Sequence, residues 1–275
     1  MNGRRCLAGL MESLRKSGRA AFIPYITAGD PTLGATRLFL SALESARADI
    51  VELGVPFSDP MADGPVNQRS SQRALKNGAT LARILVFAGR YRRNGGKVPI
   101  VLFTYFNPLL RFGLKAFAKK AEESGIDGVL TVDLPPEEAG EYRRCLEERG
   151  IAAIFLASPT TSASRMKLIG RASTSFVYYV SRLGVTGERN KLSSSLAAEL
   201  KRLREKVRKP VAVGFGISTP GQVRAAARHA DGVVVGSALV KLIEGRSPAR
   251  AARLIRTAAS AMVRALRGSR RTICS

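Results

Sequence analysis

Glu52 is the side chain whose type and position are best suited to acid–base chemistry. It lies in the apolar run Asp49–Leu53, where Val51 and Leu53 flank it. Side chains alternate along a strand, so Glu52 shares one face with Ile50 and its two neighbours share the other. Burial at the end of a strand raises the pKa of a carboxyl group, which suits a group that donates and accepts a proton. The alternative is a structural glutamate held in an ion pair.

Two further acids follow in the loop Gly54–Pro65. Asp59 precedes Pro60 and Asp63 precedes Gly64, in a loop that holds three prolines and two glycines in all. A second carboxylate close to the strand-end glutamate permits divided acid and base roles, provided that the two environments separate the pKa values. Each aspartate could instead serve only as a turn former.

Two glycine turns follow the last two apolar runs that we interpret as strands. The turn Gly214–Pro220 contains Gly216, and the turn Gly236–Ala238 contains Ser237 and opens a helix. Backbone N–H groups at a helix start favour a bound anion. Many parallel barrels bind phosphate at this position, so the pair of turns predicts a phosphate site.

The segment Ser181–Gly187 follows the sixth predicted strand and combines Arg182, Thr186 and two glycines. It could close over a bound phosphate or be a mobile loop. Tyr178 lies within the strand before this segment. Its alternatives are a place in the site and simple packing in the core.

Eight short apolar runs, rich in Val, Ile and aromatic residues, would position these side chains. Near-continuous apolar runs are typical of parallel strands buried on both faces, and they alternate here with helical patterns, which indicates crossover helices. We therefore predict an α/β fold, an eight-stranded parallel (β/α) TIM barrel whose active site lies in the loops after the strands. An open doubly wound sheet is the alternative, but no Gly-x-Gly-x-x-Gly turn follows the first run. The runs are Ala21–Thr27, Asp49–Leu53, Val98–Phe103, Gly128–Asp133, Ile151–Leu156, Ser175–Val180, Val211–Gly214 and Gly232–Gly236, and the helical patterns include Leu33–Ala46, Leu81–Arg93, Leu114–Ser124, Glu137–Arg149 and Leu192–Val207.

No linker or shift in composition divides the chain, so we expect a single domain over residues 1–275. The spacing of Leu7, Leu10, Met11 and Leu14 predicts an extra amphipathic helix within residues 1–18. Residues 267–275 form a basic tail. We expect no secretory signal and no membrane span, because no apolar run approaches the roughly 18 residues that a span needs.

The 275 residues include three scattered cysteines and one histidine, His229, so no metal-ligand cluster can be written and a reducing, cytoplasmic setting is expected. We interpret His229 as a helix-end residue. The net charge is +24, which attracts polyanions. The basic residues are spread along the chain without interleaved stacking aromatics, so we interpret the excess as compositional background rather than a functional nucleic-acid site.

These motifs together resemble the tryptophan synthase alpha subunit family over almost the whole chain. The most specific segment is Glu52–Pro65, and the others are Phe22–Pro31, Gly184–Gly187, Gly214–Ser218 and Gly236–Ser237. The resemblance implies a lyase of tryptophan biosynthesis that cleaves indole-3-glycerol phosphate to indole and glyceraldehyde 3-phosphate. The sequence departs from the family at Arg47 and His229, in helix-to-strand turns where the family usually has glycine.

The resemblance also implies roles for individual residues. It implies Glu52 as the general acid/base, Asp63 as its partner at the indole nitrogen, and Tyr178 beside them. The implied substrate-binding residues are Tyr25, Phe103, Tyr105, Thr186 and Phe215, and the implied phosphate-binding residues are Gly187, Gly216, Gly236 and Ser237. It implies no metal or organic cofactor in this chain. The implied partner is a beta subunit that carries pyridoxal phosphate, in an alpha2beta2 heterotetramer, with contacts near Pro56–Pro60 and Asn107–Pro108.

Three other functions stay open from the sequence alone. The chain could be a non-catalytic subunit that docks on a partner and activates it, although the intact Glu52 and Asp63 argue against this. It could bind nucleic acid, on its charge alone. It could also be a related phosphate-binding barrel of tryptophan or histidine biosynthesis.

Overall fold

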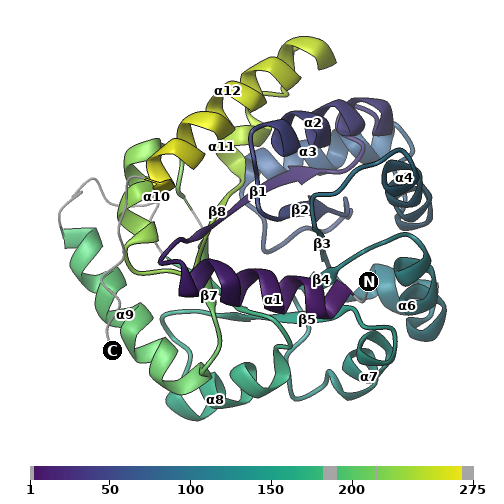
Figure 1. Ribbon diagram of the computed structural model, residues 1–275. Helices are drawn as coiled ribbons and strands as arrows, with labels where there is room; N and C mark the ends of the chain where they lie inside the picture. Colours follow the sequence, from purple (N-terminus) through teal and green to yellow (C-terminus); the bar gives the residue numbers. More distant parts are fainter. Residues whose placement is uncertain (1–2, 182–190, 215, 268–275) are drawn as a thin grey trace.

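Eight parallel strands form a closed barrel in the computed structural model, which describes residues 3–181, 191–214 and 216–267 and the side chains of these except 3–6 and 191–195. Each strand pairs with the next, and β8 pairs with β1 to close the ring (Figure 1). The predicted parallel barrel is confirmed, and the open sheet is wrong because no strand edge is left between β1 and β8. The strands are β1 (Ala21–Thr27), β2 (Val51–Gly54), β3 (Ile100–Thr104), β4 (Gly128–Thr131), β5 (Ala152–Ala157), β6 (Val177–Val180), β7 (Val211–Gly214) and β8 (Gly232–Val235).

Helices surround the barrel and connect successive strands (Figure 1). The five predicted helical patterns all fall on helices, with shifts of a few residues at some ends. The helices are α1 (Gly3–Lys16), α2 (Leu33–Ser45), α3 (Pro65–Lys76), α4 (Leu81–Arg93), α5 (Phe106–Phe112), α6 (Leu114–Glu123), α7 (Gly140–Glu148), α8 (Ala163–Ala172), α9 (Lys191–Val207), α10 (Pro220–Ala227), α11 (Ser237–Val240) and α12 (Pro248–Arg267).

Alternate residues of each strand feed two separate apolar layers. In β2 the buried Val51 and Leu53 belong to the layer between strands and helices. Ile50, on the other face, belongs to the cluster inside the barrel. This parity confirms the predicted division and directs Glu52 to the barrel interior.

Helix α1 closes the amino-terminal end of the barrel, as the predicted N-terminal helix would. Leu7, Met11 and Leu14 are buried in the interior cluster with strand residues that include Ile23 and Val234. Each such side chain contributes about 1.5–3 kcal/mol on burial. The site therefore has to form at the opposite, carboxyl-terminal end.

The connection after β2 differs from the sequence prediction. The sequence analysis identified the loop Gly54–Pro65 but not helix α3, which begins where this loop ends. The buried residues of α3 are Ser70, Ser71 and Ala74, so the helix lacks the large apolar side chains that make a helical period visible.

The two departures from the family's glycine pattern behave differently. Arg47 has a φ of 63° and occupies the left-handed region. His229 does not, because Arg208 is the other described non-glycine residue with a positive φ. His229 follows the right-handed residue Arg228, which confirms the interpretation of His229 as a helix-end residue.

No helix in the described part of the chain is long and apolar enough to cross a membrane. The single-domain boundaries stay a prediction, and residues 268–275 of the tail lie outside the described residues.

Candidate active site

Glu52 lies at the carboxyl end of β2, beside Tyr25 of β1 in the strand register. Its side chain has 0% exposure, and neither carboxyl oxygen has a hydrogen-bond partner among the described residues. Burial raises the pKa of Glu52 to about 8. The ion pair considered from the sequence is absent from the described structure. At neutral pH this carboxyl group is mostly protonated and can donate a proton.

Asp63 is held at the site by the loop after β3. The Tyr105 hydroxyl donates a 3.1 Å hydrogen bond to Asp63 Oδ2 and accepts a 3.0 Å hydrogen bond from the Ala62 amide. Burial raises the pKa of Asp63, while hydrogen bonds from Tyr105 and Asn67 oppose the rise. Asp63 is thus more than a turn former. Sequence reasoning missed Asn67 because it lies in the unpredicted helix α3.

Tyr25 of β1 and Phe103 of β3 pack against each other beside Glu52. Their ring centroids are 5.3 Å apart in an edge-to-face arrangement, and the Tyr25 hydroxyl is 3.3 Å from Thr27 Oγ1. A Cβ at Gly54 would lie 2.2 Å from the Tyr25 hydroxyl oxygen. A glycine at the end of β2 is therefore needed for this tyrosine to reach its position.

Tyr178 shares the site with both acids. Burial raises its pKa well above the usual range, and the nearby charges of Glu52, Tyr25 and Asp63 add to the shift. Both carboxyl groups also raise the pKa of Tyr25, after the larger effect of burial. These four side chains therefore influence one another electrostatically, while Tyr178 also packs in the interior cluster. A Cβ at Gly214 would lie 2.2 Å from its hydroxyl oxygen, so a second strand-end glycine makes room for it.

The loops after β2 and β3 contact each other at the mouth of the barrel. The Phe57 ring stacks on Tyr105 with centroids 5.1 Å apart. The Gln68 side-chain amide donates to the Asp63 carbonyl oxygen at 2.9 Å and thus ties the start of α3 to the same loop. Sequence reasoning missed both Phe57 and Gln68. The aromatic residue inside a proline-rich loop was a signal for Phe57, and none pointed to Gln68.

The two glycine turns after β7 and β8 are unequal as anion sites. The Gln222 side chain accepts hydrogen bonds from the Ser218 and Thr219 amides, which closes the start of α10. Among the described residues, no side chain caps α11, which begins at the exposed Ser237 after Gly236. Gly216 has a φ of 76°, a conformation that favours glycine.

The remaining predicted residues Thr186, Gly187 and Phe215 lie outside the described residues, as does Arg182. Within the described part of the chain, no group of three His, Cys, Asp or Glu side chains could hold a metal ion. The structure thus brings together Glu52, Asp63 and Tyr178 with three of the implied substrate-binding residues, Tyr25, Phe103 and Tyr105.

The closed barrel, with the buried Glu52 and the half-buried Asp63 at its carboxyl end, has the architecture of a TIM-barrel enzyme. The sequence model of one family, described as tryptophan synthase alpha chain, matches residues 11–267. The chain belongs to this family, whose members are lyases that act on indole-3-glycerol phosphate.

Individual relatives agree over nearly the whole chain. A tryptophan synthase alpha chain of Geobacter sulfurreducens is 49% identical over 260 residues, which cover 94% of this chain and 98% of that protein. One of Xanthomonas euvesicatoria pv. vesicatoria is 51% identical over 241 residues, 87% and 90% of the two chains.

Solved structures are similar as well. The alpha subunit of Legionella pneumophila superposes with a TM-score of 0.87 at 37% identity and covers 97% of this chain and 99% of that one. A chain from the alpha2beta2 complex of Pyrococcus furiosus has a TM-score of 0.83 at 42% identity and covers 90% and 98%.

Proposed function

We propose that Glu52 and Asp63 cleave indole-3-glycerol phosphate to indole and glyceraldehyde 3-phosphate at the carboxyl end of the barrel. The protonated Glu52 donates its proton to indole C3. Asp63 faces the ring nitrogen and offsets the positive charge that develops there. The bond from C3 to the hydroxyl-bearing carbon then breaks.

In this proposal the same residue, Glu52, donates one proton and accepts another. The glycerol hydroxyl loses its proton as its carbon becomes the aldehyde of glyceraldehyde 3-phosphate. Glu52, now a carboxylate, accepts that proton and returns to its starting state. No Schiff base is required, and the proposal places no metal or organic cofactor in this chain.

The observation that carries the proposal is the pair of unpartnered Glu52 oxygens in a fully buried site. A buried carboxyl group without a hydrogen-bond partner costs stability, and such groups are concentrated at functional sites. A pKa of about 8 lets this group alternate between protonated and ionised forms near neutral pH.

The pocket walls and the phosphate turn complete the proposal. Tyr25, Phe103 and Tyr105 line the indole end, with Tyr178 beside the acids. Gly236 and Ser237 bind the phosphate with Gly216, because the start of α11 carries no side-chain cap. Thr186, Gly187 and Phe215 complete this end on the family resemblance alone.

We also propose that the chain works in the cytoplasm with a pyridoxal-phosphate beta subunit in an alpha2beta2 heterotetramer. One similar solved structure is described as an alpha2beta2 complex with mutual activation. Met61, which is 92% exposed in the loop after β2, and Leu110, which is 57% exposed on α5 after β3, support this docking. Exposed apolar side chains at one rim suit a protein partner.

Indole release from indole-3-glycerol phosphate by the purified protein, with and without a beta subunit, tests the proposal. We expect release that Glu52→Gln abolishes in both samples. A beta subunit that becomes more active while no indole is released in either sample would instead establish a non-catalytic docking subunit.

A further inference from the structure

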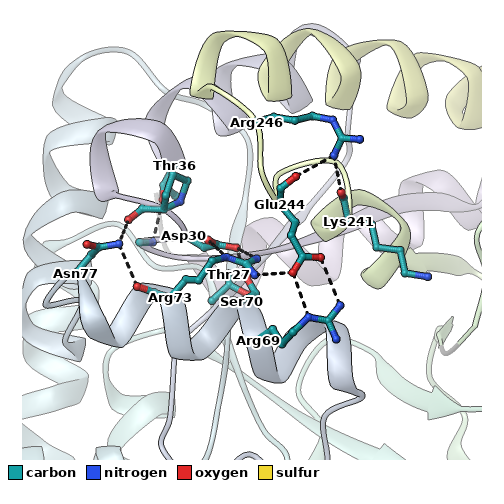
Figure 2. A network of polar contacts seen from close by, with 12 residues as sticks. Thr27, Asp30, Thr36, Arg69, Ser70, Arg73, Asn77, Lys241, Glu244 and Arg246 are labelled. Atoms are coloured by element: carbon teal, nitrogen blue, oxygen red, sulfur yellow. Dashed lines mark hydrogen bonds and ion pairs between the residues drawn. The ribbon is translucent and has the colours of Figure 1, made fainter.

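Helix α3 is anchored to the candidate active site at its start and to a second polar cluster further along. At its start, Gln68 donates to the Asp63 carbonyl oxygen at 2.9 Å. In the next two turns of the helix, Arg69, Ser70 and Arg73 donate hydrogen bonds to two acids outside the helix (Figure 2). These acids are Asp30 and Glu244. The same helix thus carries both groups of contacts.

Arg73 joins two acids that are far apart in the sequence. Its Nε and Nη2 donate to the two carboxyl oxygens of Asp30, at 2.9 and 2.7 Å, and its Nη1 donates to Glu244 Oε1 at 3.1 Å. Asp30 has 0% exposure and also accepts a hydrogen bond from Ser70. The planar guanidinium therefore holds both acids in a fixed geometry, which a lysine could not do.

Glu244 fixes the other side of the cluster. It accepts two further hydrogen bonds from Arg69, at 3.1 and 3.4 Å, and the Arg69 hydrogen bond is the main cause that lowers its pKa. Arg246 donates to the carbonyl oxygens of Glu244 and Lys241, both at 3.0 Å, which closes the turn after α11 (Figure 2).

The cluster therefore ties together two segments that lead directly into the proposed site. Helix α3 begins two residues after Asp63. Helix α11, whose following turn contains Glu244, begins directly after Gly236. Both helices also pack against β1, which carries Tyr25. The contacts of Arg73 with Asp30 and Glu244 fix the position of α3 relative to β1 and to the turn after α11.

We propose that Arg73 and Glu244 are positioning residues that set the spacing between Asp63 and the phosphate turn Gly236–Ser237. The inference rests on the proposed function, since it assigns the two ends of one substrate to these two places. A ligand that bridges both ends gains affinity from a preset spacing, whereas a ligand that occupies one end does not.

Glu244 is the residue to change. Its side chain is 42% exposed, so its removal leaves no buried cavity, while loss of Asp30 would leave Arg73 without its buried partner. Glu244→Ala removes all three arginine contacts, and Glu244→Gln keeps acceptor capacity. Glu122→Gln is a matched control. Glu122 lies on α6, away from the cluster, is 48% exposed and forms an ion pair with Arg149 at 3.2 Å.

The experiment measures dissociation constants for three probes. The first is an indole that carries a propyl phosphate chain, the second is glycerol 3-phosphate, and the third is an indole without phosphate. We expect Glu244→Ala to raise the dissociation constant of the bridging probe roughly tenfold. The dissociation constant of each single-end probe should rise less than twofold. Glu244→Gln should restore part of the loss, and Glu122→Gln should match the wild-type protein.

Equal weakening of all three probes in Glu244→Ala would overturn the inference, because that result indicates a general structural role. Unchanged binding of the bridging probe would overturn it as well. If the wild-type protein bound the bridging probe no more tightly than the single-end probes, the proposed function itself would fail. Thermal unfolding of each variant shows that the compared proteins are folded.

Discussion

Tyr105 donates a hydrogen bond to Asp63 across 42 residues of sequence, at 3.1 Å. The carboxylate supplied by the loop after β2 is therefore oriented by a residue of the loop after β3. Phe57 stacks on the same tyrosine, so a ring contact and a hydrogen bond both connect the two loops at the mouth of the barrel.

Replacement of Glu52 by Gln should keep the fold and remove most of the activity. Glutamine has the same shape but cannot transfer the proton, and loss of an acid/base group costs roughly 10²–10⁴ in rate. The measurement is kcat for indole release, with thermal unfolding as the folding control. A folded variant within a few-fold of the wild-type rate would remove Glu52 from its assigned role.

The same variant should become more stable than the wild-type protein as the pH rises. The pKa of Glu52 is raised from 4.5 to about 8 on folding, so between these values the unfolded chain releases a proton that the folded chain keeps. Wild-type stability then falls by up to about 1.4 kcal/mol per pH unit through this window and levels off above it.

Urea unfolding of both proteins at pH 5, 7 and 9 checks this prediction, because the difference between them isolates Glu52 from the other carboxyl groups. We expect the advantage of Glu52→Gln to grow from pH 5 to pH 9. A difference that does not vary with pH would mean that Glu52 titrates normally.

Substitutions at Gly236 should weaken phosphate binding in proportion to their size. A Cβ there would lie 3.5 Å from the Tyr25 Cβ, which is ordinary contact, so the protein itself has room for it. An anion at the backbone N–H groups would be pushed outward. Gly236→Ala should raise KM moderately and Gly236→Val strongly.

Inhibition constants for a glycerol phosphate analogue and a phosphate-free indole separate the causes. We expect only the phosphate-bearing ligand to lose affinity. Gly140→Ala is a suitable control, since a Cβ at Gly140 meets nothing within 4 Å. Equal losses for both ligands would place the phosphate elsewhere.

Changes at the exposed end of the β2 loop should affect the partner more than the substrate. Asp59 is exposed, and its side chain accepts a hydrogen bond from the neighbouring Ser58 hydroxyl at 2.6 Å. Asp59→Asn or Pro60→Ala should reduce activation by the beta subunit several-fold with little effect on phosphate binding. Full activation in both variants, equal to that of the surface variant Glu123→Gln, would contradict the proposed docking site.

Arg47→Gly should stabilise the protein by about 0.5–1 kcal/mol. Relief of the left-handed strain at this exposed residue is worth about 1–2 kcal/mol and is partly offset by the greater freedom of glycine in the unfolded chain. His229→Gly should destabilise, because His229 has no positive φ. Denaturant midpoints of the two variants should shift in opposite directions, and shifts of the same sign would refute this account.

The sequence was most informative where one physical pattern decides the structure. Strand alternation placed Glu52 on one face with Ile50, the face that the structure directs to the barrel interior, and glycine turns marked the ends of β7 and β8. These signals are local, because side-chain parity and positive φ depend on a few neighbouring residues.

The missing parts of the prediction depend on contacts between distant segments. Nothing in the sequence near Asp63 indicates that Tyr105 would orient it. Helix α3 was not predicted because its buried residues are serine and alanine. The roles of Asn67 and Gln68, which lie on this helix, were therefore not predicted either. The Asp30–Arg73–Glu244 cluster spans three elements and has no signature within any one of them.

Helix α1 precedes all eight strands in the sequence, yet the apolar cluster that includes it is complete only when the last strand is in place. Leu7, Met11 and Leu14 belong to an interior cluster whose other members come from strands as late as β8, where Val234 lies. Until the barrel closes, the apolar face of α1 has no complete partner and stays accessible to other molecules. Contacts between such distant segments slow folding, so docking of the first helix reports that the whole ring has closed.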